Sequence, residues 1–452
     1  MEVINKIINI GGLKMVKIAV FGTGYVGLVS GVCLADFGMT VTCVDIDKKK
    51  IDMLSNGEIP IYEPGLDVYL GRNISLERIK FTTDAKSAIE NAEVIFIAVG
   101  TPPDVNGEAD MQYVFNVAKN IGDYINEYKV VVNKSTVPIG TGQKVKKIIN
   151  EIIKKRDLII DFDVVSNPEF LREGKALQDF THPDRIVLGV ESEKAEDILK
   201  RVYRPLFINE TPFVITNIET AEMIKYACNA FLATKITFIN EIANLCEKVG
   251  ADVQQVAKGM GKDGRIGSKF LHAGPGFGGS CFPKDTKALV EIGKKYGVDM
   301  SLVRTVVNAN EKQKEMVVTK LKFKLKDLEN KTIGILGLSF KPETNDIRDA
   351  PSLTIINRLL EEGAKVKVYD PEALKDARCV LNNSNISYCK HAYDVAEDAD
   401  VLIIVTEWHE FRNMDLITIK RIMKTPILYD TRNIYTRKDL EEMGFVYIGT
   451  GV

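Results

Sequence analysis

The chain has 452 residues, of which 45% are hydrophobic and 27% are charged, a balance typical of a soluble globular protein. Its 60 Lys and Arg residues are matched by 62 Asp and Glu residues, so the formal net charge is −2. This balance argues against nucleic acid as a partner, although a few well-placed cations suffice for a phosphate pocket. No apolar run reaches the ~18–20 residues of a membrane helix, so we expect no membrane partner. The length predicts about three domains.

The start of the chain and its cysteines set two further expectations. Residues 1–14 precede Met15 and the first predicted strand, are too short and mixed for a secretory signal, and are interpreted as a possible extension. The 7 Cys residues are scattered, odd in number and without CxxC pairs, which predicts reduced thiols in a cytoplasmic protein. The 4 His residues are isolated, so no metal site is expected.

In chain order, two halves of the sequence show the same pattern of apolar segments. The first half contains KIAVF, VTCVD and AEVIFIAVG, which end at Phe21, Asp45 and Gly100. The second half contains TIGILG, VKVYD and ADVLIIVTE, which end at Gly337, Asp370 and Glu407. Short apolar runs that alternate with helical patterns indicate buried parallel strands in βαβ units. The fold class predicted is therefore α/β, with two Rossmann-like doubly wound domains.

The first predicted strand leads into a glycine-rich turn. Gly22, Gly24 and Gly27 form the pattern GxGxxG between a strand and a helix, and Asp45 ends the next strand 21 residues beyond Gly24. Such glycines allow a tight turn, close approach of a pyrophosphate and close helix packing. A carboxylate at Asp45 accepts ribose hydroxyls and repels a 2′-phosphate, which favours NAD over NADP. The alternative is a glycine turn in an ordinary βαβ unit.

Two polar segments follow in the middle of the chain. The loop 167–174 carries Glu169 and Glu173 after an apolar run, where sites form in doubly wound domains; both carboxylates are candidates for acid–base or ribose-binding roles, or are surface charge. Lys225 and Asn229 are four residues apart and share one face of a helix. They are suited to stabilising an oxyanion, or form a solvated stripe.

That helix is the longest predicted element. Thr216 and Glu219 have the form of a capping box, and the sequence from there to Gly250 contains neither Pro nor Gly. We expect this helix to bridge the two end domains and to pack against a second subunit in a homodimer or higher homo-oligomer. A helix hairpin within one subunit is the alternative. The predicted domains are 15–213, 214–312 (helical, with the long helix) and 313–452.

A cysteine loop and a second turn complete the candidates. Cys281 follows four glycines in six residues, which indicates an exposed loop, and Lys284 and Asp285 come after it. A nearby cation favours the nucleophilic thiolate, whereas the alternative is a small buried apolar Cys. In the second half, the turn after Gly337 carries Lys341 where a glycine would approach phosphate, which suits a nucleotide other than NAD.

Eight segments in order resemble one family across residues 15–452. They are GTGYVGL, VGTPP (99–103), STVPIGTG (135–142), NPEFLREG (167–174), EMIKYACNA (222–230), RIGSKFL (265–271), GFGGSCFPKD (276–285) and FKPETNDIRDAPS (340–352). On these motifs the chain is identified as similar to the UDP-glucose/GDP-mannose dehydrogenases.

The resemblance implies a four-electron oxidation of a nucleotide-sugar with NAD as cofactor. Cys281 captures the intermediate aldehyde as a thiohemiacetal, and a second oxidation gives a thioester that water cleaves to the acid. Lys225 and Asn229 hold the C6 oxygen. Asp285, Thr136 and Glu169 surround the water and its proton transfers, which leaves open which group is the base.

The resemblance also implies binding residues. Those for the cofactor are Gly22, Gly24, Tyr25, Val26, Gly27, Asp45, Lys50, Thr101, Thr136, Glu173 and Arg348. Those for the nucleotide-sugar are Glu169, Phe170, Leu171, Arg172, Lys225, Asn229, Arg265, Phe277, Gly278, Lys341 and Arg432, with Arg265 reaching a neighbouring subunit's site.

The cysteine loop favours UDP-glucose as the substrate and UDP-glucuronate as the product. GDP-mannose enzymes share GGSC and PKD and are the nearer competitor, while enzymes for N-acetylated UDP-sugars carry GGHC. A two-electron hydroxyacid dehydrogenase is less favoured because of Cys281 and the second nucleotide-type domain. A non-catalytic NAD-binding protein is less favoured because Cys281, Lys225, Asn229 and Asp285 are all present.

Overall fold

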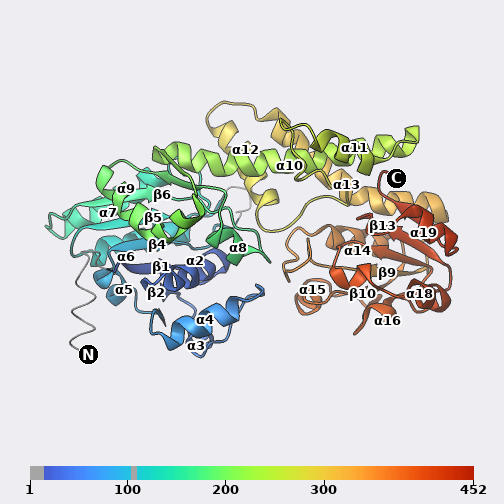
Figure 1. Cartoon of the computed structure of the whole chain (residues 1–452), viewed down its shortest axis with the longest axis horizontal. Helices are drawn as coiled ribbons and strands as arrows, with labels where there is room; N and C mark the ends of the chain where they lie inside the picture. Colours follow the sequence, from blue (N-terminus) through green and yellow to red (C-terminus); the bar gives the residue numbers. More distant parts are fainter. Residues whose placement is uncertain (1–14, 103–108) are drawn as a thin grey trace. The chain divides into compact units, whose positions relative to one another are not determined.

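The computed structural model of the chain describes residues 15–102 and 109–452 (Figure 1). The expected extension 1–14 and Pro103, within the VGTPP segment, lie outside these residues. The described chain divides into two compact units, one ending at Lys225 and the other running from Tyr226 to Val452. Each unit contains one β-sheet with helices on both faces, as the alternating pattern of the sequence predicts.

The sheet of the first unit has eight described strands in the order β3-β2-β1-β4-β5-β6-β7-β8. All neighbours are parallel except β6 and β7, which share the antiparallel pair Ser166 and Gly189. The order 3-2-1-4-5-6 within it is that of a dinucleotide-binding fold. The strands are β1 (Lys17–Phe21), β2 (Thr40–Val44), β3 (Ile79–Thr82), β4 (Val94–Ile97), β5 (Lys129–Asn133), β6 (Phe162–Ser166), β7 (Ile186–Gly189) and β8 (Phe213–Thr216).

Apolar side chains cover both faces of this sheet. In β1, Ile18 and Val20 point into one hydrophobic core, and Ala19 and Phe21 point into the other. A strand buried on both faces therefore reads as a continuous apolar run. The helices of the unit are α2 (Tyr25–Asp36), α3 (Lys48–Ser55), α4 (Leu66–Ser75), α5 (Ala85–Asn91), α6 (Gln112–Tyr124), α7 (Thr141–Lys155), α8 (Ala176–Thr181), α9 (Glu193–Val202) and the 3₁₀ turn η1 (Arg204–Asn209).

The sheet of the second unit repeats the same order, β11-β10-β9-β12-β13-β14, with every described pair parallel. The two Rossmann-like α/β domains predicted from the sequence are confirmed. The strands are β9 (Thr332–Leu336), β10 (Lys365–Tyr369), β11 (Ile386–Tyr388), β12 (Val401–Ile404), β13 (Ile427–Asp430) and β14 (Val446–Gly449).

Helices of the second unit cover both faces of this sheet and continue before it. Two hydrophobic cores lie against the sheet, one with Ile333 and Ile335 and the other with Leu336 and Leu402. The helices are α11 (Val253–Gly261), α12 (Phe282–Lys295), α13 (Ser301–Leu325), α14 (Pro351–Glu361), α15 (Leu374–Val380), α16 (Ala392–Ala396), α17 (His409–Arg412), α18 (Leu416–Ile422) and α19 (Arg437–Glu442).

The long helix predicted in the middle of the chain is α10 (Ile218–Val249), of 32 residues. Its cap differs from the expectation. The side-chain oxygen of Asn217, not that of Thr216, accepts the amide hydrogen of Thr220 at 2.8 Å. Asn217 directly precedes the first helical residue, and a cap at that position satisfies an amide that the first turn leaves free.

Two expected domain boundaries fall inside regular elements. The boundary at residue 213 divides β8, which pairs with β7 and belongs to the first sheet. The boundary at residue 312 divides α13, whose later residues Val317 and Leu321 pack into the core of the second sheet. The helix α13 continues through residue 312 although the buried side chains on either side of it, Asn310, Gln313 and Lys314, are polar.

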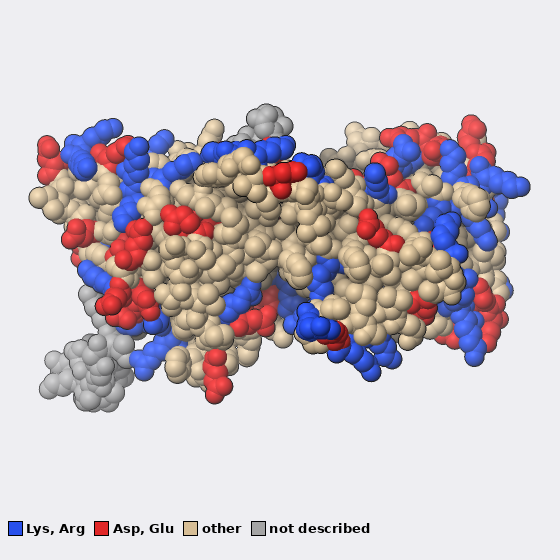
Figure 2. All heavy atoms as spheres, turned by 90° about the horizontal axis from the view of Figure 1, so that it is seen from above, with Lys and Arg blue, Asp and Glu red and all other residues tan. Residues whose placement is uncertain are grey.

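The surface is of mixed charge. On the face that Figure 2 shows, Lys and Arg side chains and Asp and Glu side chains are both scattered among uncharged residues, in keeping with the net charge of −2. In the described residues, no helix is long and apolar enough to cross a membrane.

Candidate active site

Of the three glycines in the turn after β1, Gly24 alone has open space where a side chain would lie. A Cβ atom on Gly22, whose φ is +98°, would lie 2.5 Å from the carbonyl oxygen of Ala98, and a Cβ atom on Gly27 would lie 2.0 Å from that of Gly22. These two glycines are required by the fold. At Gly24 a Cβ atom would meet nothing within 4 Å, and no side chain caps the helix α2 that begins after it. The free amides there suit an anion.

Asp45 lies at the end of β2, beside this turn. Register places Val44, the residue before it, opposite Phe21, the last residue of β1. One carboxylate oxygen of Asp45 accepts the amide and hydroxyl hydrogens of Thr23 at 2.8 and 2.7 Å. The other accepts the amide hydrogen of Asp47 at 3.0 Å. Asp45 is half-buried, so lone pairs remain on the rim for ribose hydroxyls.

The charge of Asp45 is stabilised where it stands. Partial burial opposes ionisation, but the hydrogen bonds from Asp47 and Thr23 outweigh it and hold the pKa of Asp45 below its usual range. Lys50, at the start of α3, adds a smaller electrostatic contribution in the same direction. An ionised carboxylate at this position is what discrimination against a 2′-phosphate needs.

The loop 167–174 is fixed by a buried ion pair that the sequence did not reveal. Lys134 follows β5, is almost fully buried, and places its ammonium 2.7 Å from Glu169. The other oxygen of Glu169 accepts the amides of Phe170 and Leu171 at 2.7 and 3.0 Å. Burial opposes the charge of Lys134, yet Glu169 beside it raises the pKa of Lys134 above its usual range. Glu169 is therefore held as an oriented carboxylate.

A second buried carboxylate, Glu63, anchors the other end of that loop. It accepts the amides of Gly174 and Ala176 at 2.6 and 2.7 Å and the hydroxyl of Tyr25. Leu171 and Val26 pack against the first core. The expected binding residue Arg172 is engaged by Asp179 in a two-bond pair, at 2.9 and 2.6 Å.

The remaining expected residues of the first unit lie on neighbouring elements. The Lys225 ammonium is 5.2 Å from the centre of the Phe170 ring, and the Arg185 guanidinium lies 3.9 Å from the same ring. Thr101, after β4, donates its hydroxyl to the carbonyl of Thr136 at 3.0 Å. The structure thus brings Lys225 to the loop of Glu169 and Thr101 to Thr136.

Glu222 connects α10 to the first unit. Its carboxylate accepts the amides of Gly140 and Gly142, at the start of α7, at 2.6 and 2.8 Å. Burial raises the pKa of Glu222 to about 7. Glu222 is three residues before Lys225, and Gly140 follows the loop of Thr136, so this carboxylate links the backbone segments that carry both expected groups.

Cys281 lies in the second unit, directly before α12. Its side chain is exposed, and its sulfur is 3.6 Å from the hydroxyl of Ser280. The position before the first turn of a 14-residue helix favours negative charge. The carbonyl of Cys281 accepts the amide of Asp285 at 2.8 Å, as the first hydrogen bond of that helix.

Asp285 and Asn229 form a buried pair in the same unit. The side-chain amide of Asn229 donates to Asp285 at 2.6 Å, and Lys284 lies 2.7 Å from the other oxygen of Asp285. The Asp285 side chain is wholly buried. Asn229 is therefore not part of a solvated stripe, and its partner Asp285 is one turn into the helix that Cys281 begins.

The glycine run before Cys281 corrects one expectation. It is not an exposed loop, because residues 273–279 are all buried and exposure returns only at Cys281. A Cβ atom on Gly278 would lie 2.4 Å from the carbonyl oxygen of Asp349, and one on Gly279 would lie 2.8 Å from the Phe340 ring. The glycines allow the loop to pack under the segment that follows β9.

Four further residues of the second unit were expected to bind the cofactor or the nucleotide-sugar, and each has a contact within its own unit. Arg432 donates to the carbonyl of Val405 at 2.8 Å and lies 3.1 Å from Glu407. Lys341 is 5.3 Å from the centre of the adjacent Phe340 ring. Arg348 is exposed and paired with Asp346, and Arg265 is exposed and paired with Asp263.

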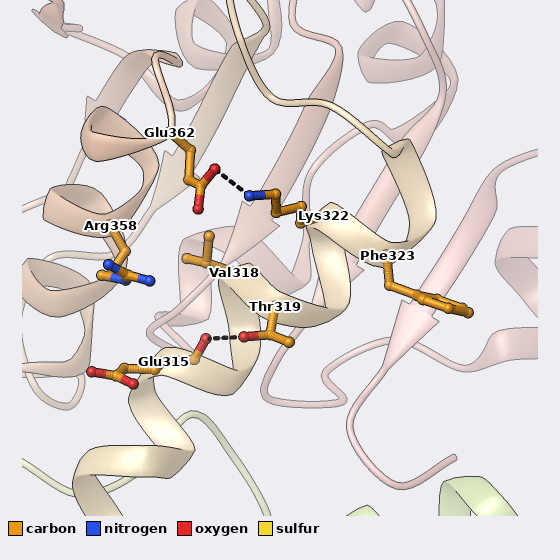
Figure 3. Close-up of a pocket in the computed structure, with 7 residues that line it drawn as sticks. All are labelled: Glu315, Val318, Thr319, Lys322, Phe323, Arg358 and Glu362. Carbon is orange, nitrogen blue, oxygen red and sulfur yellow. Dashed lines mark hydrogen bonds and ion pairs between the residues drawn. The ribbon is translucent and has the colours of Figure 1, made fainter.

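A shallow pocket in the second unit lies between α13 and α14 and contains none of the expected residues (Figure 3). Lys322 and Glu362 form an ion pair across it at 2.6 Å. Among the described residues, no group of three or more His, Cys, Asp or Glu side chains is placed to hold a metal.

The fold and these groups define a class. A Rossmann order, a turn open to an anion only at Gly24 and an ionised Asp45 are features of dinucleotide-dependent dehydrogenases. Residues 16–207 match the NAD-binding domain of the UDP-glucose/GDP-mannose dehydrogenase family, residues 219–312 match its central domain, and residues 334–437 match its UDP-binding domain. The chain belongs to this family, and NAD is the cofactor of its first domain.

Individual relatives cover nearly the whole chain. The UDP-glucose 6-dehydrogenase TuaD of Bacillus subtilis is 50% identical over 97% of this chain and 93% of its own length. The UDP-glucose 6-dehydrogenase of Rhizobium meliloti is 50% identical over 96% of this chain and 99% of its own. A solved UDP-glucose dehydrogenase from Pyrobaculum islandicum is 37% identical with a TM-score of 0.90, over 98% of this chain and 99% of its own.

Proposed function

We propose that this chain catalyses the NAD-dependent oxidation of UDP-glucose to UDP-glucuronate through a thioester on Cys281. The relatives with which it shares half of its residues are named for UDP-glucose. The observation that carries the covalent step is the exposed sulfur of Cys281 at the start of α12, at the end of a loop that is otherwise buried. A cysteine serving only as core packing would be buried with its loop.

The cofactor is proposed to bind at the turn after β1. Its pyrophosphate fits the open face at Gly24, with the amides at the start of α2 as donors, and the ribose fits the rim carboxylate of Asp45. NAD held there would supply the hydride acceptor for each of the two oxidations. Lys50, Thr101, Glu173 and Arg348 remain proposed cofactor contacts.

The chain's own groups are proposed to act on the aldehyde that the first oxidation yields. The Cys281 thiolate adds to the carbonyl carbon, and a carbon–sulfur bond forms while the carbonyl oxygen takes the negative charge. The Lys225 ammonium and the Asn229 amide stabilise that oxygen. After the second oxidation, water cleaves the thioester, and the sulfur leaves as a thiolate while the water's proton passes to a carboxylate or to solvent.

We propose that the carboxylates of Glu169 and Asp285 position the water that cleaves the thioester. Glu169 keeps its orientation through Lys134 and two backbone amides, and Asp285 keeps its orientation through Asn229 and Lys284. Each carboxylate has a cationic partner within ion-pair distance, which suits it to accept a hydrogen bond from water. Thr136 remains a proposed participant in these proton transfers.

The nucleotide is proposed to bind in the second unit, through Lys341 and Arg432. The Arg432 guanidinium is held from two sides, by the Val405 carbonyl and by Glu407, which limits the entropy lost when it binds an anion. Phe277, Gly278, Phe170, Leu171, Arg172 and Arg265 remain proposed contacts of the nucleotide-sugar.

A homodimer through α10 is also proposed. Phe231, Phe238 and Leu245 are seven residues apart along one stripe of this helix, and their side chains are 66%, 44% and 57% exposed. Large apolar side chains at heptad spacing are suited to a second copy of the same helix. A cytoplasmic location is supported by the 7 cysteines, all of which are free.

A turnover assay tests the proposal. Purified full-length chain is given NAD with UDP-glucose, GDP-mannose or UDP-N-acetylmannosamine, and reduced cofactor is followed by absorbance. We expect turnover with UDP-glucose, and a loss of at least about 10²-fold in kcat for Cys281→Ser. The control Cys379→Ser removes another exposed thiol and should leave kcat unchanged.

Three outcomes would overturn parts of the proposal. Turnover with only another nucleotide-sugar overturns the substrate. An unaffected Cys281→Ser variant overturns the covalent step. Binding of NAD without turnover of any nucleotide-sugar overturns the enzymatic proposal as a whole.

A further inference from the structure

The buried loop before Cys281 contains no regular secondary structure, and its backbone is held by side-chain amides. Asn310 of α13 is almost fully buried and bonds to both polar groups of one residue of this loop. Its oxygen accepts the amide hydrogen of Phe277 at 2.8 Å, and its nitrogen donates to the carbonyl of Phe277 at 3.0 Å. Asn310 thus replaces the neighbouring strand that an extended residue would have in a sheet.

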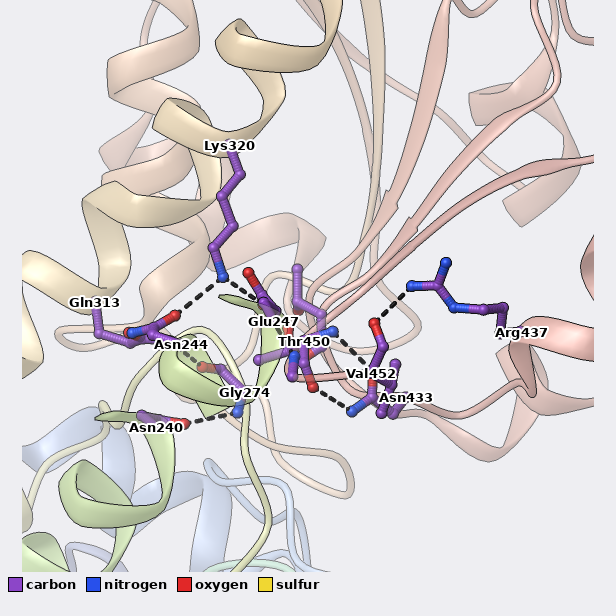
Figure 4. Close-up of polar contacts among 12 residues, drawn as sticks. Asn240, Asn244, Glu247, Gly274, Gln313, Lys320, Asn433, Arg437, Thr450 and Val452 are labelled. Carbon is purple, nitrogen blue, oxygen red and sulfur yellow. Dashed lines mark hydrogen bonds and ion pairs between the residues drawn. The ribbon is translucent and has the colours of Figure 1, made fainter. Parts of the chain in front are cut away.

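Two further amides hold the start of the loop in the same way (Figure 4). Asn240 of α10 accepts the amide hydrogen of Gly274 at 2.8 Å, and Gln313 of α13 donates to the carbonyl of Gly274 at 2.9 Å. Gln313 is itself oriented by Asn244 at 2.8 Å, which in turn accepts from Lys320 at 3.0 Å. The loop is therefore held by hydrogen bonds from side chains of two helices, α10 and α13.

Asn310 bonds to Phe277, which lies four residues before Cys281 in the chain. The ring of Phe277 meets the ring of Phe282 edge to face, with centres 6.0 Å apart and planes at 85°. Phe282 directly follows Cys281 in the chain. The residue that Asn310 fixes therefore contacts the residue after the sulfur as well as leading to it along the backbone.

The two hydrogen bonds to Phe277 require both an acceptor and a donor on the side chain at position 310. Aspartate at position 310 would keep an acceptor for the Phe277 amide but would place a second oxygen against the Phe277 carbonyl. A buried carbonyl that loses its donor is left without compensation for the water it has given up. The close fit also involves Gly276, where a Cβ atom would lie 3.0 Å from the Asn310 oxygen.

We propose that Asn310 is a positioning residue for Cys281, which sets where the sulfur stands when it meets the aldehyde. This inference rests on the proposed function, because it assigns a role in the step that uses the thiolate. Asn310 touches no reacting atom. Its contribution is to hold the loop so that the second oxidation follows the first without release of the aldehyde.

A rapid-mixing experiment tests this role with the full-length chain. Asn310→Asp and the matched control Asn308→Asp, an exposed position on the same helix, are each mixed with NAD and UDP-glucose. The reduced cofactor of the first oxidation should appear within about threefold of the wild-type rate in both variants. The second should be slowed about 10–100-fold in Asn310→Asp alone, with the KM for NAD unchanged.

A second measurement needs no sugar and keeps the inference separate from the proposed function. Alkylation of Cys281 by iodoacetamide, followed by peptide mass spectrometry, should slow at least about threefold in Asn310→Asp, because the sulfur leaves its exposed position directly before α12. If the wild-type chain showed no turnover, the proposed function would be overturned. The alkylation rate of Cys281 would still test whether Asn310 sets the position of the sulfur.

The outcome against the inference is defined for each variant. Equal slowing of both oxidations, or an unchanged alkylation rate in folded Asn310→Asp, would reduce Asn310 to a residue of general stability and overturn the proposal. Should Asn310→Asp not fold, Gln313→Met removes one hydrogen bond to the same loop. It should slow the second oxidation selectively by about 3–10-fold, and equal slowing would again contradict the proposal.

Discussion

The two sheets share one strand order but treat the carboxylate after their second strand in opposite ways. Asp45 is half-buried, and within the described residues its carboxylate accepts hydrogen bonds from Thr23 and Asp47. Its counterpart Asp370 is wholly buried, and its two oxygens accept six hydrogen bonds. One of these comes from the indole of Trp408, at 3.1 Å. The first carboxylate is available to a ligand and the second is part of the fold.

The turns that precede these carboxylates differ in the same sense. Gly22 and Gly337 both have a positive φ and follow the first strand of their sheet. The first turn enters α2 within three residues, which leaves the amides of a helix open to an anion. The second runs on to Ala350 before α14 begins, and this segment covers the glycine run before Cys281. One topology therefore serves to bind a cofactor in one unit and to pack the reactive loop in the other.

The largest expected effect of this difference is on stability. Asp370→Ala leaves six donors without their acceptor, several of them buried amides, and should lower the free energy of unfolding of the second unit by about 4 kcal/mol or more. Asp45→Ala should lower that of the first unit by about 1 kcal/mol. Thermal unfolding of both variants measures the contrast, and equal losses would refute the assignment of Asp370 to the fold.

A pH series sharpens the comparison through buried carboxylates. Burial raises the pKa of Glu222 in the first unit to about 7 and that of Asp430 in the second to about 6. A raised pKa favours the folded state at low pH, and this stabilisation is lost as the pH rises through the folded value.

The variant Glu222→Gln removes this titration from the first unit. The free energy of unfolding of the variant minus that of the wild type should increase by about 3 kcal/mol from pH 5 to pH 8. Urea unfolding at the two pH values gives the difference. A constant difference between variant and wild type would mean that Glu222 is ionised throughout.

The smallest effect concerns the cofactor. Asp45→Ala should raise the KM for NAD about tenfold, or ~1.4 kcal/mol, and narrow the preference for NAD over NADP, because a rim carboxylate that repels a 2′-phosphate is lost. The exposed Asp52→Ala on α3 is the control and should leave both values unchanged. An unchanged preference for NAD over NADP in Asp45→Ala would contradict the assignment of Asp45 to cofactor binding.

Sequence patterns predicted the parts of the molecule that depend on neighbouring residues. The apolar runs predicted the strands on both sides of Gly22 and Gly337, and the uninterrupted helical pattern predicted α10. The cap was assigned to Thr216, one residue too early, because Thr216 and Asn217 are both good caps and only the backbone decides between them.

Groups whose partners are distant in the sequence escaped prediction. Lys134 meets Glu169, Glu222 meets Gly142, and Asn310 meets Phe277, each across more than 30 residues. In the sequence, a lysine or an amide is expected to be exposed, and only its distant partner shows that it is buried. The glycine run was interpreted as exposed for the same reason, since Asp349 and Phe340 lie in another part of the chain.

The central claim is that one active site carries the sugar from alcohol to acid through Cys281, and the stoichiometry of the reaction tests it most directly. A limiting amount of UDP-glucose is converted to completion with excess NAD, and reduced cofactor is counted against sugar consumed. The account predicts about two reduced cofactors for each UDP-glucose, with UDP-glucuronate as the product. One reduced cofactor for each sugar, with free aldehyde in solution, would contradict it.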